Sequence, residues 1–441
     1  MPPTKTTATA GKTTAPAAPR SGFSGGPPPP PPPPGPGPPA PPPPRPAPGP
    51  AGRPRTPPRK PPAGSIGIGI ETEFFLREKK NVTGDDGRKF AVKFCDDYMA
   101  FKKGLPVDPT KGAPEIPGVY TKWPGVTKHL EPPSRLGRHA DWVTHQDPTV
   151  DVDKDLSAAD LKKEQDRLKG AHGVEVISHI LRAYEGSAWR REVQKMWEFI
   201  DANYVVLDNR NCSTHVHLSR AEPWTVEQIK RLAQAIIHFE PAFEAMVPPA
   251  RRNNEYARSN WIDNLRFAGK SRDQAMDEIE KQRTIKDVLN LMHGADDQSK
   301  YYGWNFLTLE SYKTVEFRRG APSKSAADVF MWVELAMEFM QAAIVVKTRA
   351  DFGKYARNVG GLKKLIADAR LPQSVGTNQS AYLAPLYARA GSDTAMLEPK
   401  PVKLETLSKE KKAKLALKID ADKKWQPMLD MLKDAQAKNE L

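Results

Sequence analysis

Three short segments of the chain each carry two chemically active side chains at positions i and i+2. The pairs are Glu71/Glu73, His215/His217 and Glu316/Arg318. Because side chains alternate along a β-strand, both members of each pair face the same side. The neighbouring residues are apolar or small, so the opposite side of each segment is expected to pack into a core. If the strands share one sheet, its polar face carries three acids, two imidazoles and an arginine.

Crowded carboxylates repel one another, and such crowding is typical of a site that binds a cation between them. Glu71, Glu73 and Glu316 offer the hard oxygen ligands that Mg²⁺ or Mn²⁺ prefers, and Mn²⁺ also accepts histidine. Glu175, between two valines in a strand-like segment, adds another acid. Phosphate is the usual co-ligand of Mg²⁺, and Arg318 could neutralise it. The sequence therefore predicts a divalent-metal site and a nucleoside triphosphate as substrate.

Each of these features also has a plainer interpretation. A lone pair of glutamates on a strand is common at protein surfaces, and a His-x-His pair can be structural or pH-sensitive. The spacing Cys212-x-x-His215-x-His217 could instead hold zinc, although the chain has one other cysteine, Cys95, far away in sequence. The coincidence of three pairs favours the divalent-metal interpretation.

Strands and helices are expected to be interspersed along the chain. The patterns predict strands over residues 66–75, 142–145, 174–178, 214–218 and 313–318. Apolar residues spaced by three or four predict helices over residues 189–200, 226–241 and 330–344, and a further helix over 281–292 is interpreted as an insertion. Residues 81–136 look long and irregular. The expected fold is α+β, with helices packed on one face of a sheet.

The ends of the chain differ from its centre. Of the 45 prolines, 27 lie in residues 1–64, a stretch without acids that is expected to be a disordered tail with polyproline II character. This tail could dock onto a polyproline-binding domain or act as a passive spacer. Residues 65–350 are predicted to form the main domain, and 351–441 a helical, lysine-rich C-terminal extension.

Composition narrows the function classes. The net charge is +14, but residues 65–398 carry only +2, so we do not expect the folded part to bind nucleic acid. No apolar segment is long enough to cross a membrane. Two cysteines cannot build a disulfide framework and fit a reducing compartment, which favours the cytoplasm, with import into an organelle as the alternative.

Six motifs in order give the chain a family resemblance. The motifs are Gly-Ile-Glu71-Thr-Glu73-Phe, Trp142-Val-Thr-His-Gln-Asp147, Gly173-Val-Glu175-Val-Ile-Ser178, Cys212-Ser-Thr-His215-Val-His217, Pro249-Ala-Arg251-Arg-Asn-Asn-Glu-Tyr256 and Thr314-Val-Glu316-Phe-Arg318. In these motifs the chain resembles the amidoligase family, from about residue 65 to about 346. That family belongs with glutamine synthetase and the glutamate–cysteine ligases among the carboxylate–amine ligases.

The resemblance implies a glutamine-synthetase-like domain, in which a curved antiparallel sheet backed by helices binds ATP and divalent ions. It also implies roles for individual residues. Metal ligands would be Glu71, Glu73, Glu175, His215 and Glu316; ATP would contact His217, Arg318 and Asn305; and the catalytic set would be Arg318, Asp147, Arg251 and Tyr256. The histidine in Thr-His145-Gln before Asp147 departs from the family pattern.

The expected activity is an ATP- and Mg²⁺-dependent ligase that joins a carboxylate to an amine through an acyl phosphate. The substrates could be small molecules, peptides or protein side chains. Two alternatives stay open. One is a catalytically silent scaffold that docks partners through its polyproline tail, and the other is a phosphotransferase on the same fold.

Overall fold

This computed structural model of the chain describes residues 61–80, 84–104, 117–131, 140–153, 156–293, 299–369 and 379–402. The predictions of a polyproline tail and of a helical segment over residues 403–441 therefore fall outside the described residues, apart from the last few residues of the tail region. Among the described residues, no helix is long and apolar enough to cross a membrane.

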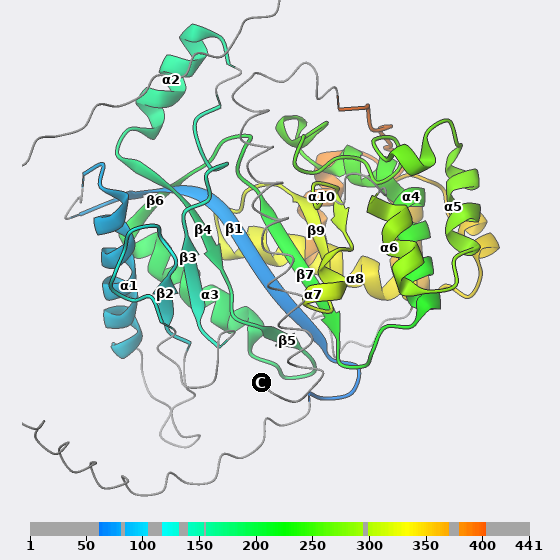
Figure 1. Cartoon of the computed structure of the whole chain (residues 1–441), viewed down its shortest axis with the longest axis horizontal. Helices are drawn as coiled ribbons and strands as arrows, with labels where there is room; N and C mark the ends of the chain where they lie inside the picture. Colours follow the sequence, from blue (N-terminus) through cyan, green and yellow to red (C-terminus); the bar gives the residue numbers. More distant parts are fainter. Residues whose placement is uncertain are drawn as a thin grey trace, which may run out of the picture. The chain divides into compact units, whose positions relative to one another are not determined.

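A nine-stranded open sheet forms the centre of the fold (Figure 1). Its main order is β2-β3-β4-β1-β7-β9-β8, with β5 and β6 also paired to β1. The strands are β1 (Ile66–Glu78), β2 (Val119–Thr121), β3 (Trp142–His145), β4 (Ala171–Ile177), β5 (Leu181–Ala183), β6 (Tyr204–Leu207), β7 (Thr214–Arg220), β8 (Trp304–Asn305) and β9 (Val315–Gly320). The five predicted strands are confirmed.

The expectation of a purely antiparallel sheet is wrong, because β2 pairs with β3 in parallel. Residues 122–141 connect these two strands, and this length allows the chain to cross over and re-enter the sheet in the same direction. All other pairings in the sheet are antiparallel. The sheet is therefore mixed.

The long strand β1 organises the sheet. On one side it pairs with β4 and then β5, and on the other side with β6 and then β7. On each side of β1, the two strands therefore follow one another along β1 and are separated by a loop: residues 178–180 between β4 and β5, and residues 208–213 between β6 and β7. Along β1, the apolar residues at alternate positions from Ile66 to Leu76 are buried in the main core, while Glu71 and Glu73 point to the other face.

Helices cover the apolar face of the sheet. The ten helices described are α1 (Gly87–Lys103), α2 (Ala158–Leu168), α3 (Trp189–Asn203), α4 (Val226–Met246), α5 (Arg272–Glu280), α6 (Ile285–His293), α7 (Thr308–Ser311), α8 (Ala326–Ile344), α9 (Val359–Asp368) and α10 (Gln379–Ala390). Three short 3₁₀ turns, η1 (Pro249–Arg251), η2 (Leu265–Phe267) and η3 (Arg349–Lys354), complete the secondary structure of the described residues.

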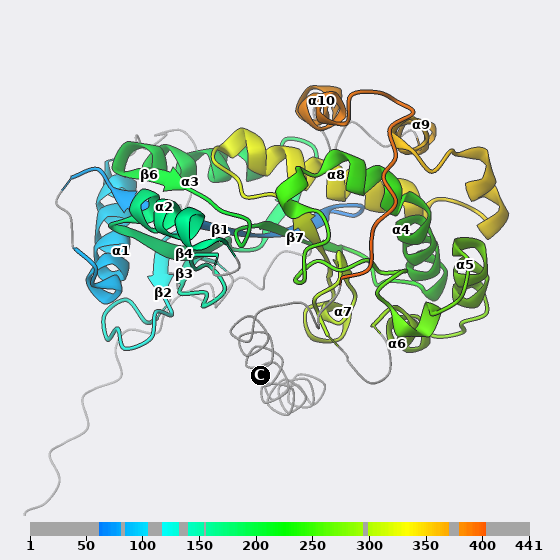
Figure 2. The same cartoon turned by 90° about the horizontal axis from the view of Figure 1, so that it is seen from above.

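Figure 2 shows α3 and α8 along one face of the sheet, with α9 and α10 outside α8. The helix α8 is buried almost along its whole length because it lies between the sheet and this outer layer. Leu362 and Leu365 of α9 and Leu383 and Leu386 of α10 belong to the main core. The described part of the predicted C-terminal extension is therefore an integral layer of the fold.

The prediction that the helix over residues 226–241 ends at Pro241 is wrong, since α4 continues to Met246. A proline inside a helix removes the N–H that would bond to the carbonyl four residues earlier. Here that carbonyl belongs to Ile237, and Arg272 Nη1 donates a hydrogen bond of 2.7 Å to it. A side chain from α5 thus replaces the missing backbone donor.

Two further predictions need correction. Residues 81–136 contain α1 and β2, and α1 places Phe90, Phe94 and Tyr98 in the core, so this segment is not irregular throughout. The helix expected over residues 281–292 is α6, which begins later, at Ile285, because residues 281–284 form the break between α5 and α6.

Candidate active site on the polar face of the sheet

The three predicted pairs lie on one face of the sheet. The strand register places Glu71 opposite His215, Gly69 opposite His217, and His217 opposite Glu316. On the other side of β1, Glu73 lies opposite Glu175, which in turn lies opposite His145 of β3. Polar side chains thus cross the sheet from β3 to β8, where Asn305 lies opposite Glu316.

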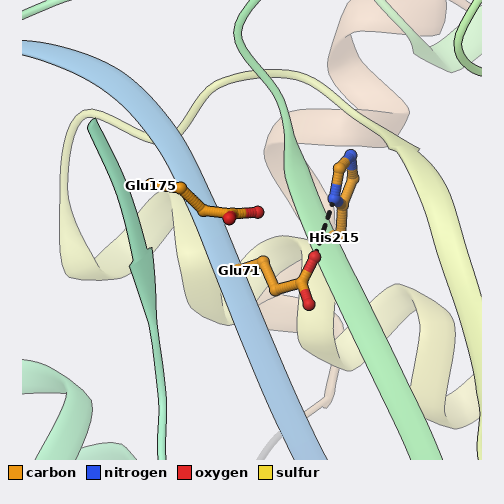
Figure 3. Close-up of side chains that lie close together, drawn as sticks. All are labelled: Glu71, Glu175 and His215. Atoms are coloured by element: carbon orange, nitrogen blue, oxygen red, sulfur yellow. Dashed lines mark hydrogen bonds and ion pairs between the residues drawn. The ribbon is translucent and has the colours of Figure 1, made fainter. Parts of the chain in front are cut away.

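Glu71, His215, His217 and Glu316 form the first cluster. Glu71 Oε2 lies 3.2 Å from His215 Nδ1, and Glu71 Oε1 lies 3.2 Å from His217 Nε2. Glu316 Oε1 approaches the same two nitrogens at 3.8 and 3.7 Å. Figure 3 shows the Glu71 carboxylate turned toward His215, with Glu175 projecting toward it from β4.

Two residues hold the Glu316 carboxylate in place. Arg318 Nη1 donates a hydrogen bond to Glu316 Oε1, and Asn305 Nδ2 donates one of 2.7 Å to Glu316 Oε2. Arg318 is buried, and its Nε also reaches the backbone carbonyl of Tyr256. The guanidinium of Arg318 therefore lies at the edge of the acidic cluster and points toward the Glu316 carboxylate.

Glu73, Glu175 and Asp147 form the second cluster, on the other side of β1. All three side chains are buried. Ser213 Oγ donates a hydrogen bond to Glu73 Oε2 and lies 2.7 Å from His215 Nε2, so this hydroxyl connects the two clusters. His145 Nδ1 lies 3.6 Å from Glu175 Oε2.

Three sets of side chains could each hold a cation, since the ligand atoms of each set lie within 4.8 Å of one another. The sets are Glu71–Glu175–His215, Glu71–His217–Glu316 and Glu73–Asp147–Glu175. Carboxylate oxygens with one imidazole nitrogen match the preferences of Mg²⁺ and Mn²⁺. Because Glu71 and Glu175 each occur in two sets, the sets form one continuous ligand surface that fits more than one ion.

The charges of this cluster depend on one another. Burial raises the pKa of Glu316, but Arg318 and His217 outweigh this effect and hold the pKa at about 2. Burial also raises the pKa of Glu71, and the two histidines lower it well below its ordinary value. The pKa of His217 is raised despite burial, because Glu316 and Glu71 favour its protonated form. Both carboxylates are therefore ionised at neutral pH and ready to act as ligands.

Arg251 and Tyr256 occupy supporting positions. Buried Arg251 donates hydrogen bonds to the backbone carbonyls of Arg210, at 3.1 Å, and Arg318, at 3.3 Å. Burial lowers its pKa to about 10, an effect opposed by attraction to Glu73. The ring of Tyr256 packs edge-on against Tyr301. The contacts of Arg251 thus tie the loop at residues 208–213 to β9.

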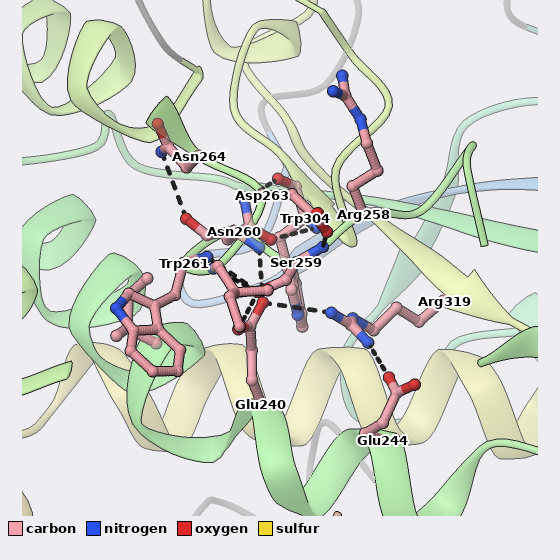
Figure 4. A network of polar contacts seen from close by, with 12 residues as sticks. Glu240, Glu244, Arg258, Ser259, Asn260, Trp261, Asp263, Asn264, Trp304 and Arg319 are labelled. Atoms are coloured by element: carbon pink, nitrogen blue, oxygen red, sulfur yellow. Dashed lines mark hydrogen bonds and ion pairs between the residues drawn. The ribbon is translucent and has the colours of Figure 1, made fainter. Parts of the chain in front are cut away.

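A buried ionic network lies beneath β9 and fixes the loop that follows α4 (Figure 4). Arg319 donates to Glu244 and, at 3.2 Å, to Glu240. Glu240 also accepts a 2.6 Å hydrogen bond from the backbone N–H of Asn260, and the Asn260 side chain bonds both backbone groups of Trp304. This chain of contacts connects α4 to β8, the strand that carries Asn305.

Two site residues carry no predicted role. Ser213 lies in the loop at residues 208–213, where its backbone carbonyl accepts a hydrogen bond of 2.8 Å from the Glu73 N–H. Its position next to the His-x-His segment is the sequence feature that could have indicated a role in the site. His145 stands out in the sequence only as a departure from the family pattern. The alternative zinc set fails on Cys212, which packs with Phe75, Val150 and Leu168 and belongs to none of the three ligand sets.

Residues 134–340 match a family described as "Putative amidoligase enzyme". This region is similar to the amidoligase family. The predicted resemblance is thereby confirmed, although the match begins after β1 and β2 rather than near residue 65. No curated protein matches the chain. The strand β1, which lies before the matched region, stands in the middle of the sheet and carries Glu71 and Glu73, so the folded unit that contains the matched region also includes part of the chain before residue 134.

Proposed function

We propose that this protein is an ATP-dependent ligase that forms an amide bond between a carboxylate and an amine. The family description supports amide-bond formation. The observation that carries the dependence on a nucleotide and a divalent ion is the overlap of three ligand sets on one sheet face, with Arg318 at its edge.

The donor set fits Mg²⁺ or Mn²⁺. Glu71, His217 and Glu316 would hold one ion, and Glu73, Asp147 and Glu175 a second. Ions bound there would withdraw charge from the phosphoryl oxygens of ATP. Arg318 would stabilise the negative charge that develops on the transferred phosphoryl group, since its guanidinium presents several donors in a fixed geometry.

The proposed reaction has two chemical steps. First, a carboxylate oxygen of the substrate attacks the γ-phosphorus of ATP, the bond to the β-phosphate oxygen breaks, and ADP leaves. Second, the amine attacks the acyl carbon of the acyl phosphate, inorganic phosphate leaves, and the nitrogen loses a proton. Asp147 is the proposed acceptor of that proton, through the carboxylate oxygen that would not contact the second ion. Arg251, Tyr256 and Asn305 hold the surrounding backbone and the Glu316 carboxylate.

The proposal extends to the architecture. We infer a glutamine-synthetase-like domain, in which the polar sheet face is the nucleotide side and α3 and α8 support the opposite face. The central position of β1, with acids at alternate residues and a buried apolar side, supports this inference.

Hydroxylamine offers a test that does not require the natural amine, because it converts acyl phosphates to hydroxamates. The full-length protein is incubated with ATP, Mg²⁺, hydroxylamine and a panel of carboxylates, and hydroxamate, ADP and phosphate are measured. We expect equal amounts of the three products, and loss of all three in Glu316→Gln. The control Glu278→Gln changes a surface acid of α5 that pairs with Lys281 and should retain activity.

Two other outcomes would contradict the proposal. ADP with a phosphorylated acceptor and no hydroxamate would indicate a phosphotransferase. Absence of nucleotide binding by the folded protein would indicate a scaffold without catalysis.

A further inference from the structure

Beyond the acidic clusters, the polar face of β1 continues over two glycines to a second arginine. Gly67 lies opposite Arg182 of β5 on one side and opposite Ser219 of β7 on the other. A Cβ added to Gly67 would lie 2.3 Å from Ser219 Oγ and 3.0 Å from Arg182 Nη1. Glycine at this position therefore allows the guanidinium and the hydroxyl to converge above the strand.

These groups lie on the same face as the proposed active site. Gly67 and Glu71 are four residues apart on one strand, so they share a face, and their Cα atoms are separated by about 13 Å at the usual rise per residue. Gly69 lies between them and adds no side chain to the row. Between the ligand cluster and Arg182, β1 therefore contributes no side chain of its own to this face, and the side chain of His217 lies beside Gly69.

Arg182 and Ser219 differ from the other polar groups of this face. Within the described ranges, neither the guanidinium of Arg182 nor the hydroxyl of Ser219 has a hydrogen bond or an ion pair, whereas Arg318 is bonded to Glu316. Arg220, the next residue of β7, faces the other side of the strand and is bonded to Gln228 and Glu222. Arg182 is partly exposed, and the exposed side chains of Ile180 and Tyr184 stand on either side of it.

Resting on the proposed ligase function, we propose that Arg182 and Ser219 bind a second, non-reacting carboxylate of the carboxylate substrate. A guanidinium binds a carboxylate through two parallel hydrogen bonds, and a neighbouring hydroxyl adds a third donor. The distance from the ligand cluster selects a substrate of peptide length with two separated carboxylates, rather than a single amino acid. Ile180 and Tyr184 provide apolar surface for the part of the substrate that lies between its two carboxylates or beside them.

Linear dicarboxylates from succinate to sebacate serve as probes of the distance. Their binding to the full-length protein with Mg²⁺ and a non-hydrolysable ATP analogue is measured by calorimetry, and their turnover by the hydroxamate assay. We expect affinity to rise with chain length in the wild type. In Arg182→Gln the longest diacids should lose about 10- to 100-fold in affinity, as expected for loss of a charge-assisted pair. Ser219→Ala should lose less.

Several readouts keep this proposal separate from the proposed function. Arg191→Gln, an exposed arginine of α3, is the matched control and should behave as the wild type. Octanoate, which has one carboxylate, should bind wild type and Arg182→Gln equally. The KM for ATP should not change in Arg182→Gln, and a parallel rise in that KM would overturn the proposal by assigning Arg182 to the nucleotide.

The calorimetric measurement of diacid binding tests the carboxylate subsite even if the protein shows no catalysis. If the wild type binds long diacids but forms no hydroxamate, the carboxylate subsite holds and the ligase mechanism fails. If hydroxamate forms with no dependence on diacid length and none on Arg182, the ligase mechanism holds and the subsite is refuted. Unchanged thermal midpoints in the variants exclude misfolding as the cause of either result.

Discussion

Replacing Arg319 by methionine should destabilise the fold strongly, because this arginine neutralises two buried acids beneath β9. Arg319, Glu240 and Glu244 are all at most 5% exposed. Removing one partner of a buried ion pair leaves an uncompensated charge, which costs about 3–5 kcal/mol in the free energy of unfolding. Arg272 also lies 3.9 Å from Glu240 and compensates part of its charge, so the lower end of this range is expected.

The cost of the Arg319→Met substitution should depend on pH. Burial already raises the pKa of Glu240, and attraction to Arg319 and Arg272 counteracts that rise. Without Arg319 the folded-state pKa rises further above its unfolded value, so the folded protein keeps its proton more strongly than the unfolded chain. Stability is then lost as pH rises, and the deficit of the variant is larger at pH 8 than at pH 5.

Urea denaturation of wild type and variant at pH 5 and pH 8 measures this difference. Arg349→Met is the control, because Arg349 pairs with Asp273 and Asp277 at the surface and should cost at most about 1 kcal/mol. An Arg319→Met deficit below about 1 kcal/mol, or one that shrinks toward pH 8, would refute the argument that the network carries unscreened charge.

Three further changes give separable results. Burial lowers the pKa of His238 to about 4, so the stability present above the unfolded pKa of about 6.5 should fall by on the order of 3 kcal/mol as the pH drops toward 4. His238→Phe should remove this part of the pH dependence in urea denaturation, and the same dependence of unfolding free energy on pH in wild type and variant would contradict it. Burial and the neighbouring Glu334 raise the pKa of Glu338 to about 8, which makes its ionisation costly in the folded protein. Glu338→Gln should therefore raise the thermal midpoint more at pH 8.5 than at pH 6, and a midpoint below that of the wild type at pH 8.5 would disprove this. Ser213→Ala should weaken Mn²⁺ binding about 10-fold, because Ser213 orients Glu73 and His215. Unchanged affinity in the folded variant would show that the hydroxyl has no such role.

The polar face of the sheet was predictable from the sequence because strand periodicity is local. Glu71/Glu73, His215/His217 and Glu316/Arg318 each lie between apolar residues, and burying those residues forces the polar pair to the other side. Once the strands share a sheet, the pairs must share a face. The five predicted strands and the helices α3, α4 and α8 follow from the same local periodicity.

Features that depend on partners distant in sequence were not predictable. Pro241 stays within α4 because Arg272, from another helix, satisfies the carbonyl that the proline leaves unbonded. Ser213 reaches Glu73 only because a loop interrupts the strand path of β6 and β7 next to β1. The parallel pairing of β2 with β3 depends on a connection that carries no periodic signal.

Direct binding of Mn²⁺ tests the central claim that the shared sheet face is a divalent-cation site. Electron paramagnetic resonance counts free Mn²⁺ as the full-length protein is titrated, with and without a non-hydrolysable ATP analogue. We predict saturable binding that the analogue strengthens, and a loss of at least about 100-fold in the double variant Glu71→Gln, Glu316→Gln, which removes ligands from two of the three sets. Binding of equal strength in the folded double variant, or none in the wild type, would contradict the account.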